Sequence, residues 1–205
     1  LAEYKDLGAE FAKWRAVLNV GGSIGSIVAN AYGLARYAKK CQLKGIVPIV
    51  EPEVLMEGKH TIYETFQATQ LVLQQVFEAL RYETVVLEHM ILKPNMVLAG
   101  YQNDTALPEE VADMTLRCFS RSVPAAVPMI AFLSGGQPDG NAATNLNAMN
   151  SESCPIYSPW YLSFSFGREL QQRALASWSA GYDLGAKEEF LRRAKECSFA
   201  TWGEL

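Results

Sequence analysis

Five short apolar runs separated by longer amphipathic segments constrain the fold of this chain more than any other feature. The runs are near-continuous, as in strands buried on both faces of a parallel sheet, and they span Phe11 to Leu18, Ile46 to Val50, Val85 to Leu92, Val127 to Leu133 and Tyr161 to Phe166. Helical patterns lie between them at residues 24–42, 62–80, 108–122 and 142–149, and follow the last run at 167–178 and 187–197. This alternation predicts parallel strands joined by right-handed crossovers.

Two architectures satisfy that order, a doubly wound open sheet and a (βα)8 barrel, and periodicity alone does not choose between them. No Gly-x-Gly-x-x-Gly run and no phosphate-loop lysine motif follows any of the runs. Their absence weakens the nucleotide-binding version of the open sheet. We therefore favour the α/β class with a (βα)8 TIM barrel.

Composition and charge exclude several function classes. The chain has 205 residues, of which 49% are hydrophobic and 20% charged, which fits one ordinary globular domain. A net charge of -4 gives no field that attracts nucleic acid or an anionic membrane, and the apolar runs are too short and too proline-broken to cross a bilayer. The four cysteines are far apart, without a Cys-x-x-Cys pair, so we expect neither a metal site nor disulfides.

Every predicted strand ends in polar residues. Lys13 and Arg15 alternate onto one face of the first run, with Trp14 on the other, and Glu51 and Glu53 alternate at the end of the second. The later strands end in Lys93, in Ser134-Gly135-Gly136 and in Gly167-Arg168. Because the carboxyl ends of parallel strands carry the ligand sites of α/β folds, this pattern predicts an active-site rim.

Lys93 is the residue of this rim whose side chain points most clearly to a chemical reaction. It stands where an apolar run opens into the segment Pro94-Asn95-Met96. An amine held partly out of water loses affinity for its proton and becomes a nucleophile toward carbonyls, so Lys93 is a candidate Schiff-base former. The alternative interpretation is a lysine that extends from a strand end into solvent.

Six blocks that span nearly the whole chain resemble class I fructose-bisphosphate aldolase, in the family's order and at close to its spacing. They are Phe11 to Arg15, Gly45 to Glu53, Leu92 to Val97, Phe132 to Gln137, Asn145 to Ala148 and Phe164 to Arg168. The resemblance implies a TIM barrel of which residues 1–205 represent strands four to eight, the C-terminal two-thirds of a single domain. The family's first third and its C-terminal tail, which supply further catalytic and phosphate-binding groups, have no counterpart in this sequence.

The resemblance also implies a role for each rim residue. Lys93 forms the imine with the substrate ketone, Glu51 is the acid/base carboxylate, and Lys13 is a second catalytic lysine that stabilises negative charge. Arg15 and Glu53 are substrate-site residues expected to orient these groups. No cofactor and no metal is implied, because the protonated imine itself accepts the electron pair.

Phosphate recognition is assigned to the last two strand ends. Hydroxyls, glycine backbone N–H groups and a guanidinium at a helix start are suitable donors to an anion. The residues expected to provide them are Ser134, Gly135, Gly136, Ser165, Gly167 and Arg168. A sugar phosphate is therefore the expected substrate.

The activity implied is the reversible cleavage of fructose-1,6-bisphosphate to dihydroxyacetone phosphate and glyceraldehyde-3-phosphate, in glycolysis. The family also implies a homo-tetramer, and the sequence shows no targeting segment, so the cytoplasm is the expected compartment. A non-catalytic aldolase-like structural or binding subunit is the alternative, favoured by the missing third and by the bulky pair His89-Met90 before the lysine. Another Schiff-base barrel, such as a transaldolase, fits the lysine but not the full set of blocks.

Overall fold

The computed structural model describes residues 1–205, and its five strands form one wholly parallel sheet. The strands are β1 (Phe11–Leu18), β2 (Val47–Val54), β3 (Ile91–Leu92), β4 (Met129–Phe132) and β5 (Tyr161–Phe164). Their order in space is their order in the chain, β1-β2-β3-β4-β5. Since right-handed crossovers in such an order all fall on the same side of the sheet, this is the arc of a barrel, whereas a doubly wound sheet reverses its strand order.

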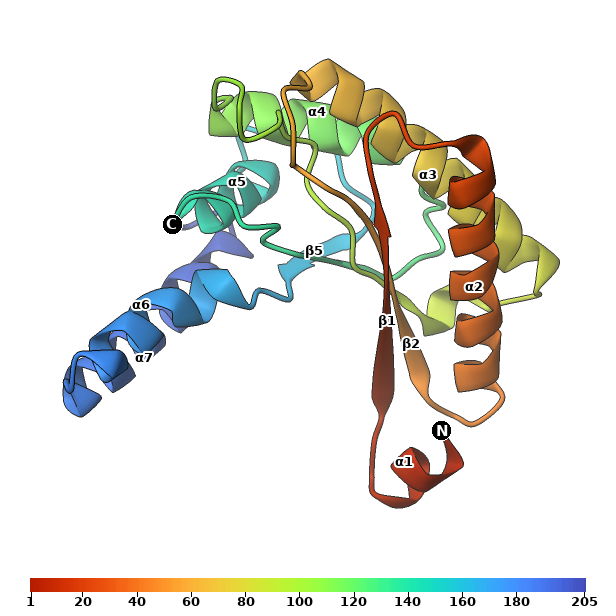
Figure 1. Ribbon diagram of the computed structural model, residues 1–205, viewed down its shortest axis with the longest axis horizontal. Coiled ribbons are helices and arrows are strands. Elements are labelled where there is room, and N and C mark those ends of the chain that lie inside the picture. Colours follow the sequence, from red (N-terminus) through yellow and green to blue (C-terminus); the bar gives the residue numbers. More distant parts are fainter.

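Most of the helices cover the outer side of that arc, and a short N-terminal helix lies beyond the start of β1 (Figure 1). They are α1 (Ala2–Asp6), α2 (Ile24–Gln42), α3 (Ile62–Tyr82), α4 (Pro108–Ser120), α5 (Asn141–Asn150), α6 (Arg168–Ser179) and α7 (Asp183–Ala200). Neighbouring helices pack against one another from α2 to α5, while α6 and α7 pair as a hairpin that extends away from the sheet. None of these helices is long and apolar enough to cross a membrane.

Local capping chemistry starts the two longest helices where the sequence places polar residues. The Ser23 hydroxyl accepts a hydrogen bond from the Ser26 N–H at 3.2 Å and begins α2. At the start of α3, Thr61 and Glu64 form a reciprocal capping box. Each cap satisfies backbone donors that the first helical turn leaves without a partner.

One predicted strand is largely wrong. Of the run Val85 to Leu92 only Ile91–Leu92 is a strand, and Leu87–His89 form a 3-10 turn. The backbone of Val86 bonds to the side chain of Gln42 in α2, with N–H to Oε1 at 3.0 Å and C=O to Nε2 at 2.8 Å. The run is apolar because Val85 and Met90 are buried in the core. The other four strands agree with the predicted runs to within a few residues at their ends.

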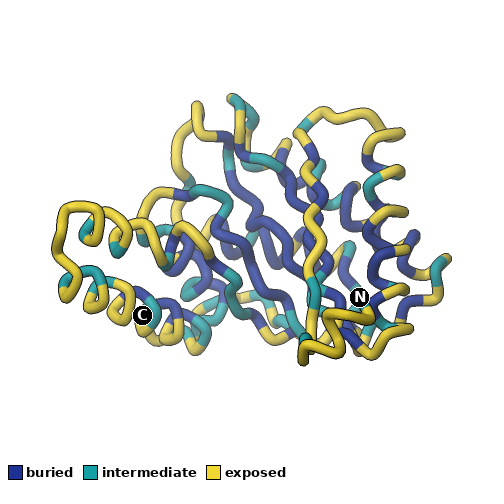
Figure 2. The backbone as a smooth tube through the Cα atoms, turned by 60° about the horizontal axis from the view of Figure 1, so that its bottom comes forward, coloured by how far each residue is buried: buried dark blue, intermediate teal, exposed yellow.

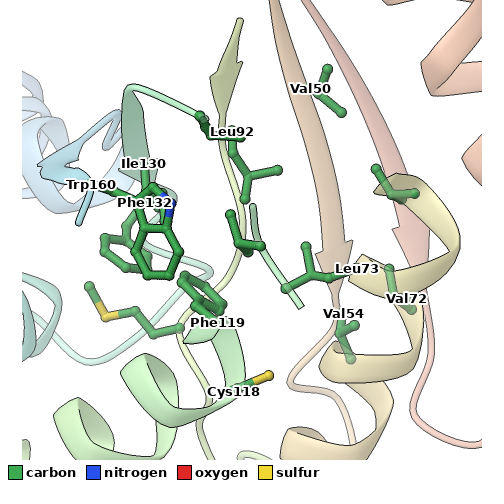
Figure 3. Packing of buried hydrophobic residues seen from close by; sticks show 14 of the residues in the cluster. Val50, Val54, Val72, Leu73, Leu92, Cys118, Phe119, Ile130, Phe132 and Trp160 are labelled. Carbon is green, nitrogen blue, oxygen red and sulfur yellow. The ribbon is translucent and has the colours of Figure 1, made fainter. Parts of the chain in front are cut away.

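Residues on the outer face of the sheet form the centre of the core. Val50, Leu92, Ile130 and Leu162 stand in register across four strands and are all buried. Phe132 of β4 stacks on Phe119 of α4, with ring centroids 5.8 Å apart (Figure 3). This packing fixes the strands against the helices and leaves the opposite, inner face to carry the polar residues.

The two outermost strands have no neighbour on their outer edge. Much of β1 is exposed while the central strands are buried, as Figure 2 shows. On the inner face, Phe11 of β1 is 62% exposed and Tyr161 of β5 is 78% exposed. Free sheet edges of this kind can pair with further strands, and exposed apolar side chains beside them can be buried by such pairing.

Candidate active site

The strand register brings the predicted rim residues to the inner face of the sheet. Trp14 packs on Tyr37 of α2, with ring centroids 5.4 Å apart, so the alternating positions Lys13 and Arg15 face the other way, as predicted. Arg15 pairs with Glu51 in the β1–β2 ladder. Lys93 follows β3 directly, and its N–H continues the β2–β3 ladder by donating to the Val50 carbonyl at 2.8 Å.

A single buried carboxylate joins the two lysines. Glu51 is 3% exposed, and its Oε2 accepts a hydrogen bond from Lys13 Nζ at 2.7 Å. Its other oxygen, Oε1, lies 3.2 Å from Lys93 Nζ. Lys93 is 9% exposed, which contradicts the alternative interpretation of a lysine extended into solvent. A carboxylate within hydrogen-bond reach of a buried amine is placed to give protons to that amine's adducts and to take protons from them.

A second ion pair, between Arg15 and Glu53, lies beside Glu51 and the two lysines. Arg15 Nε donates to Glu53 Oε2 at 2.5 Å, and Glu53 is buried. This hydrogen bond raises the pKa of Arg15, with a further contribution from the nearby Glu51 charge. Arg15 is therefore a fixed positive charge beside the lysine pair, and Glu53 holds it in place.

The predicted phosphate-binding residues meet the lysine group in one cavity of about 230 Å³. Its lining consists of Arg15, Glu51, Glu53, Lys93, Leu133, Ser134, Gly135, Ser165, Gly167 and Arg168. Nine of these were predicted from the sequence as site residues, and only Leu133 was not. Two predicted residues lie outside this lining, Lys13, which reaches Glu51 from β1, and Gly136, which lies beside Arg168.

Hydrogen-bond donors without a partner in the protein surround the cavity. Ser134 to Gln137 form a turn closed by the Gln137 N–H donating to the Ser134 carbonyl at 3.0 Å. Gly135 and Gly136 both have positive φ, as a type I′ turn requires, and their N–H groups donate to no protein acceptor. The Arg168 side chain, at the start of α6, forms no ion pair. Such a group of free donors suits a phosphate.

Asn95 fixes the loop that follows Lys93. Its Oδ1 accepts from the Val54 N–H at 2.9 Å, and its Nδ2 donates to Thr69 Oγ1 at 3.2 Å and to the Met96 carbonyl at 3.0 Å. Asn95 is buried. These bonds tie the loop that follows Lys93 to helix α3 and to the end of β2, the strand that carries Glu51.

Sequence reasoning missed two features beside the site. Tyr101, from the loop after β3, donates a hydrogen bond to the Gly135 carbonyl. The second feature is Arg193 of α7, which contacts Asp139 after β4 and Glu169 of α6. Tyr101 is 34 residues from Gly135 in the chain, and Arg193 is 54 residues from Asp139. No local sequence pattern indicates contacts between residues so far apart.

Known proteins resemble this chain along its whole length. A family model described as fructose-bisphosphate aldolase class-I matches residues 1–205. The cytosolic fructose-bisphosphate aldolase 6 of Arabidopsis thaliana is 50% identical over 206 residues, which cover 98% of this chain and 57% of that protein. A probable class 1 fructose-bisphosphate aldolase of Xylella fastidiosa is 47% identical over 211 residues, or 100% of this chain and 62% of that protein.

Solved structures agree with these relatives. The fructose-bisphosphate aldolase of Plasmodium falciparum, crystallised with TRAP and a small-molecule inhibitor, matches with a TM-score of 0.93 and 44% identity. The match covers 99% of this chain and 60% of that one, and it confirms the predicted barrel class. The chain thus spans about three-fifths of the length of the relatives that it matches. It belongs to the class I fructose-bisphosphate aldolase family.

Proposed function

We propose that this chain carries the Schiff-base centre of a fructose-bisphosphate aldolase, which reversibly cleaves fructose-1,6-bisphosphate to dihydroxyacetone phosphate and glyceraldehyde-3-phosphate. The observation that supports this most strongly is the Glu51 carboxylate, which contacts both Lys93 and Lys13. The names of the relatives agree with it.

The chemistry begins with Lys93. Its amine attacks the substrate ketone carbon to form a carbinolamine, and loss of water leaves an imine that is protonated on nitrogen. Glu51, 3.2 Å from Lys93 Nζ, is placed to give the departing hydroxyl its proton. As the C3–C4 bond breaks, its electron pair moves into the imine to form an enamine, while the C4 hydroxyl gives its proton to the Glu51 carboxylate and becomes the aldehyde.

The enamine step requires no metal, because the protonated imine accepts the electron pair. Protonation of the enamine at C3 and hydrolysis of the imine then release dihydroxyacetone phosphate and restore the amine. Lys13 contributes a positive charge beside Glu51, and the Arg15–Glu53 pair holds the group in place. In this proposal Lys93, Glu51 and Lys13 are the catalytic residues.

One phosphate of the substrate binds at the free donors beside this centre. Ser134, the Gly135–Gly136 turn and Ser165 provide hydroxyl and N–H donors, and Gly167 leads into Arg168. Because the cavity that they line also contains Lys93 and Glu51, a bound phosphate sets the distance from the substrate carbonyl to the lysine.

We further propose that residues 1–205 form the C-terminal two-thirds of one barrel, in which further strands pair with the free edges of β1 and β5. The exposed inner-face residues Phe11 and Tyr161 support this, since closure would bury them. A homo-tetramer in the cytoplasm, acting in glycolysis, is the assembly and setting that family membership suggests. Cytosolic names among the relatives support the compartment.

The test is borohydride reduction of the protein with dihydroxyacetone phosphate, followed by peptide mapping. We expect one adduct, on Lys93, which Lys93→Arg abolishes. The matched control, Lys187→Arg, changes an exposed lysine of α7 and should leave the adduct unchanged. Adducts spread over exposed lysines, or none at all, would refute the proposal.

A cleavage assay then separates the enzyme from the non-catalytic alternative. A Lys93 adduct together with release of glyceraldehyde-3-phosphate supports the aldolase. An adduct without cleavage identifies a binding subunit that has kept the lysine chemistry alone.

A further inference from the structure

Tyr101 lies at the meeting point of three loops beside the anion-binding donors. Its N–H donates to the Met56 carbonyl at 2.9 Å, and the preceding Gly100 N–H donates to the His60 carbonyl at 2.9 Å, so the segment after β2 anchors its backbone. Its hydroxyl donates to the carbonyl of Gly135 after β4. The side chain therefore connects the loops that follow β2, β3 and β4.

The acceptor of this hydrogen bond is the central peptide of the Ser134–Gln137 turn. Gly135 has φ 58° and Gly136 has φ 76°, the signs of a type I′ turn. A rotation of the Gly135–Gly136 peptide plane by about 180° converts the turn to type II′, in which only the first central residue has positive φ. Glycine adopts either sign of φ at little cost, so the sequence permits both turns.

The orientation of that peptide decides whether the turn attracts or repels an anion. In a planar trans peptide, the Gly135 C=O and the Gly136 N–H point in opposite directions. A rotated peptide would present a carbonyl oxygen where the N–H now lies, and an oxygen lone pair repels phosphate. A hydrogen bond that holds the carbonyl thus also holds the N–H.

Arg168 lies against the same turn. A Cβ built on Gly136 would lie 2.5 Å from Tyr101 Oη and 2.6 Å from Arg168 Nη1, so the hydroxyl and the guanidinium converge over Gly136. Partial burial raises the pKa of the Tyr101 hydroxyl above that of an ordinary phenol, although the Arg168 charge opposes this shift, so the hydroxyl stays protonated and able to donate. The Tyr101 hydroxyl and the Arg168 guanidinium therefore both lie against Gly136.

We propose that Tyr101 is a positioning residue of the phosphate site, which holds the Gly135–Gly136 peptide in its anion-receptive orientation through a hydrogen bond to the Gly135 carbonyl. The inference rests on the proposed function only for the identity of the organic substrate. Phosphate itself is the group recognised. Tyr101 contacts the turn, so its effect should appear in affinity for phosphate-bearing ligands and not in the lysine chemistry.

The test compares Tyr101→Phe with the control Tyr157→Phe, a tyrosine that is 85% exposed. Imine trapping with borohydride is titrated with dihydroxyacetone phosphate and with dihydroxyacetone, which lacks the phosphate. Loss of one hydrogen bond of ordinary strength corresponds to about a five-fold rise in the half-saturating concentration. We expect that rise for dihydroxyacetone phosphate with Tyr101→Phe, and no change for dihydroxyacetone or with the control.

Inorganic phosphate gives a second readout that does not depend on the enzyme reaction. Titration of protein labelled with [15N]glycine follows the glycine N–H signals directly, and Tyr101→Phe should weaken phosphate binding by about the same five-fold. If the unmodified protein traps no imine, the proposed function fails, and the phosphate titration alone decides the role of Tyr101.

Three results would overturn the assignment. Equal phosphate affinity in Tyr101→Phe and the unmodified protein would show that the hydroxyl does not position the turn. Equal weakening of dihydroxyacetone and its phosphate would show a general effect on the site. Loss of the fold in Tyr101→Phe would show a structural role in place of the proposed one.

Discussion

Replacement of Arg193 by methionine should destabilise the protein more than any surface charge change. Arg193 lies in α7 and is 7% exposed. Its Nη2 donates to Asp139 Oδ1 at 2.7 Å, and its Nη1 donates to Glu196 Oε2 at 2.9 Å and lies 3.7 Å from Glu169 Oε1. Glu169 is 5% exposed and accepts a hydrogen bond from the Gly140 N–H at 3.1 Å. The arginine thus holds the loop after β4 against α6 and α7.

The expected magnitude follows from what the substitution leaves behind. Arg193→Met keeps the aliphatic volume but leaves the buried Glu169 carboxylate near Asp139 without its counter-ion. Loss of one partner of a buried ion pair costs about 3–5 kcal/mol. At about 2–4 °C per kcal/mol for a chain of this size, Tm should fall by roughly 6–20 °C.

The neighbouring arginine provides a matched control. Arg192 lies in the same helix, its side chain is 41% exposed, and it pairs with Glu189 at 2.7 Å. Ion pairs at the surface contribute about 1 kcal/mol or less, so Arg192→Met should lower Tm by no more than about 4 °C. Thermal unfolding followed by circular dichroism measures both variants. Equal Tm changes in the two would refute the buried-pair reasoning.

The pH dependence supplies a second check. Burial raises the pKa of Glu169, and the Arg193 charge partly opposes that rise. A carboxyl whose pKa is higher in the folded state binds more protons there than in the unfolded chain, so stability falls as pH rises through that folded pKa. Removing Arg193 raises the folded pKa further. The difference in Tm between Arg193→Met and the unmodified protein should therefore become smaller as the pH is lowered from 7 to 5. A difference that does not depend on pH would contradict this.

Three further substitutions test the site. Glu51→Gln keeps the side-chain shape but removes the proton acceptor beside the lysines, so the cleavage rate should fall by about 10²–10⁴ in a coupled assay, and a fall of less than about three-fold would rule out the acid/base role. Asn95→Ala leaves the buried Val54 N–H without its acceptor and should lower the free energy of unfolding in urea by about 1–3 kcal/mol, while an unchanged value would contradict the role of Asn95 in fixing the loop. Gly136→Ala should weaken phosphate binding, because its Cβ would lie 2.5 and 2.6 Å from two side-chain atoms, whereas Gly181→Ala, with a similar φ of +85° and nothing within 4 Å, should leave binding unchanged.

Much of the secondary structure follows from local pattern. Phe11 to Leu18 was predicted as a strand with the bounds that the structure has, and the helix at 24–42 likewise. Alternation placed Lys13 and Arg15 on one face, because side chains of a strand point to opposite sides in turn. The run at 85–92 was misread because a buried segment is apolar in any conformation. Most of this run pairs with no strand, and the backbone N–H and C=O of Val86 bond to the side chain of Gln42.

The sequence by itself determined the alternation of strands and helices, the polar residues at the strand ends and, through its six blocks, the family resemblance. Only the tertiary structure decided that one carboxylate, Glu51, contacts both lysines, since this depends on the register of β1 on β2 and on where β3 ends. It also decided that Tyr101 holds Gly135 and that Arg193 joins Asp139 to Glu169. Periodicity reports the local environment of a residue, whereas these contacts join segments that only the packing of the strands and helices brings together.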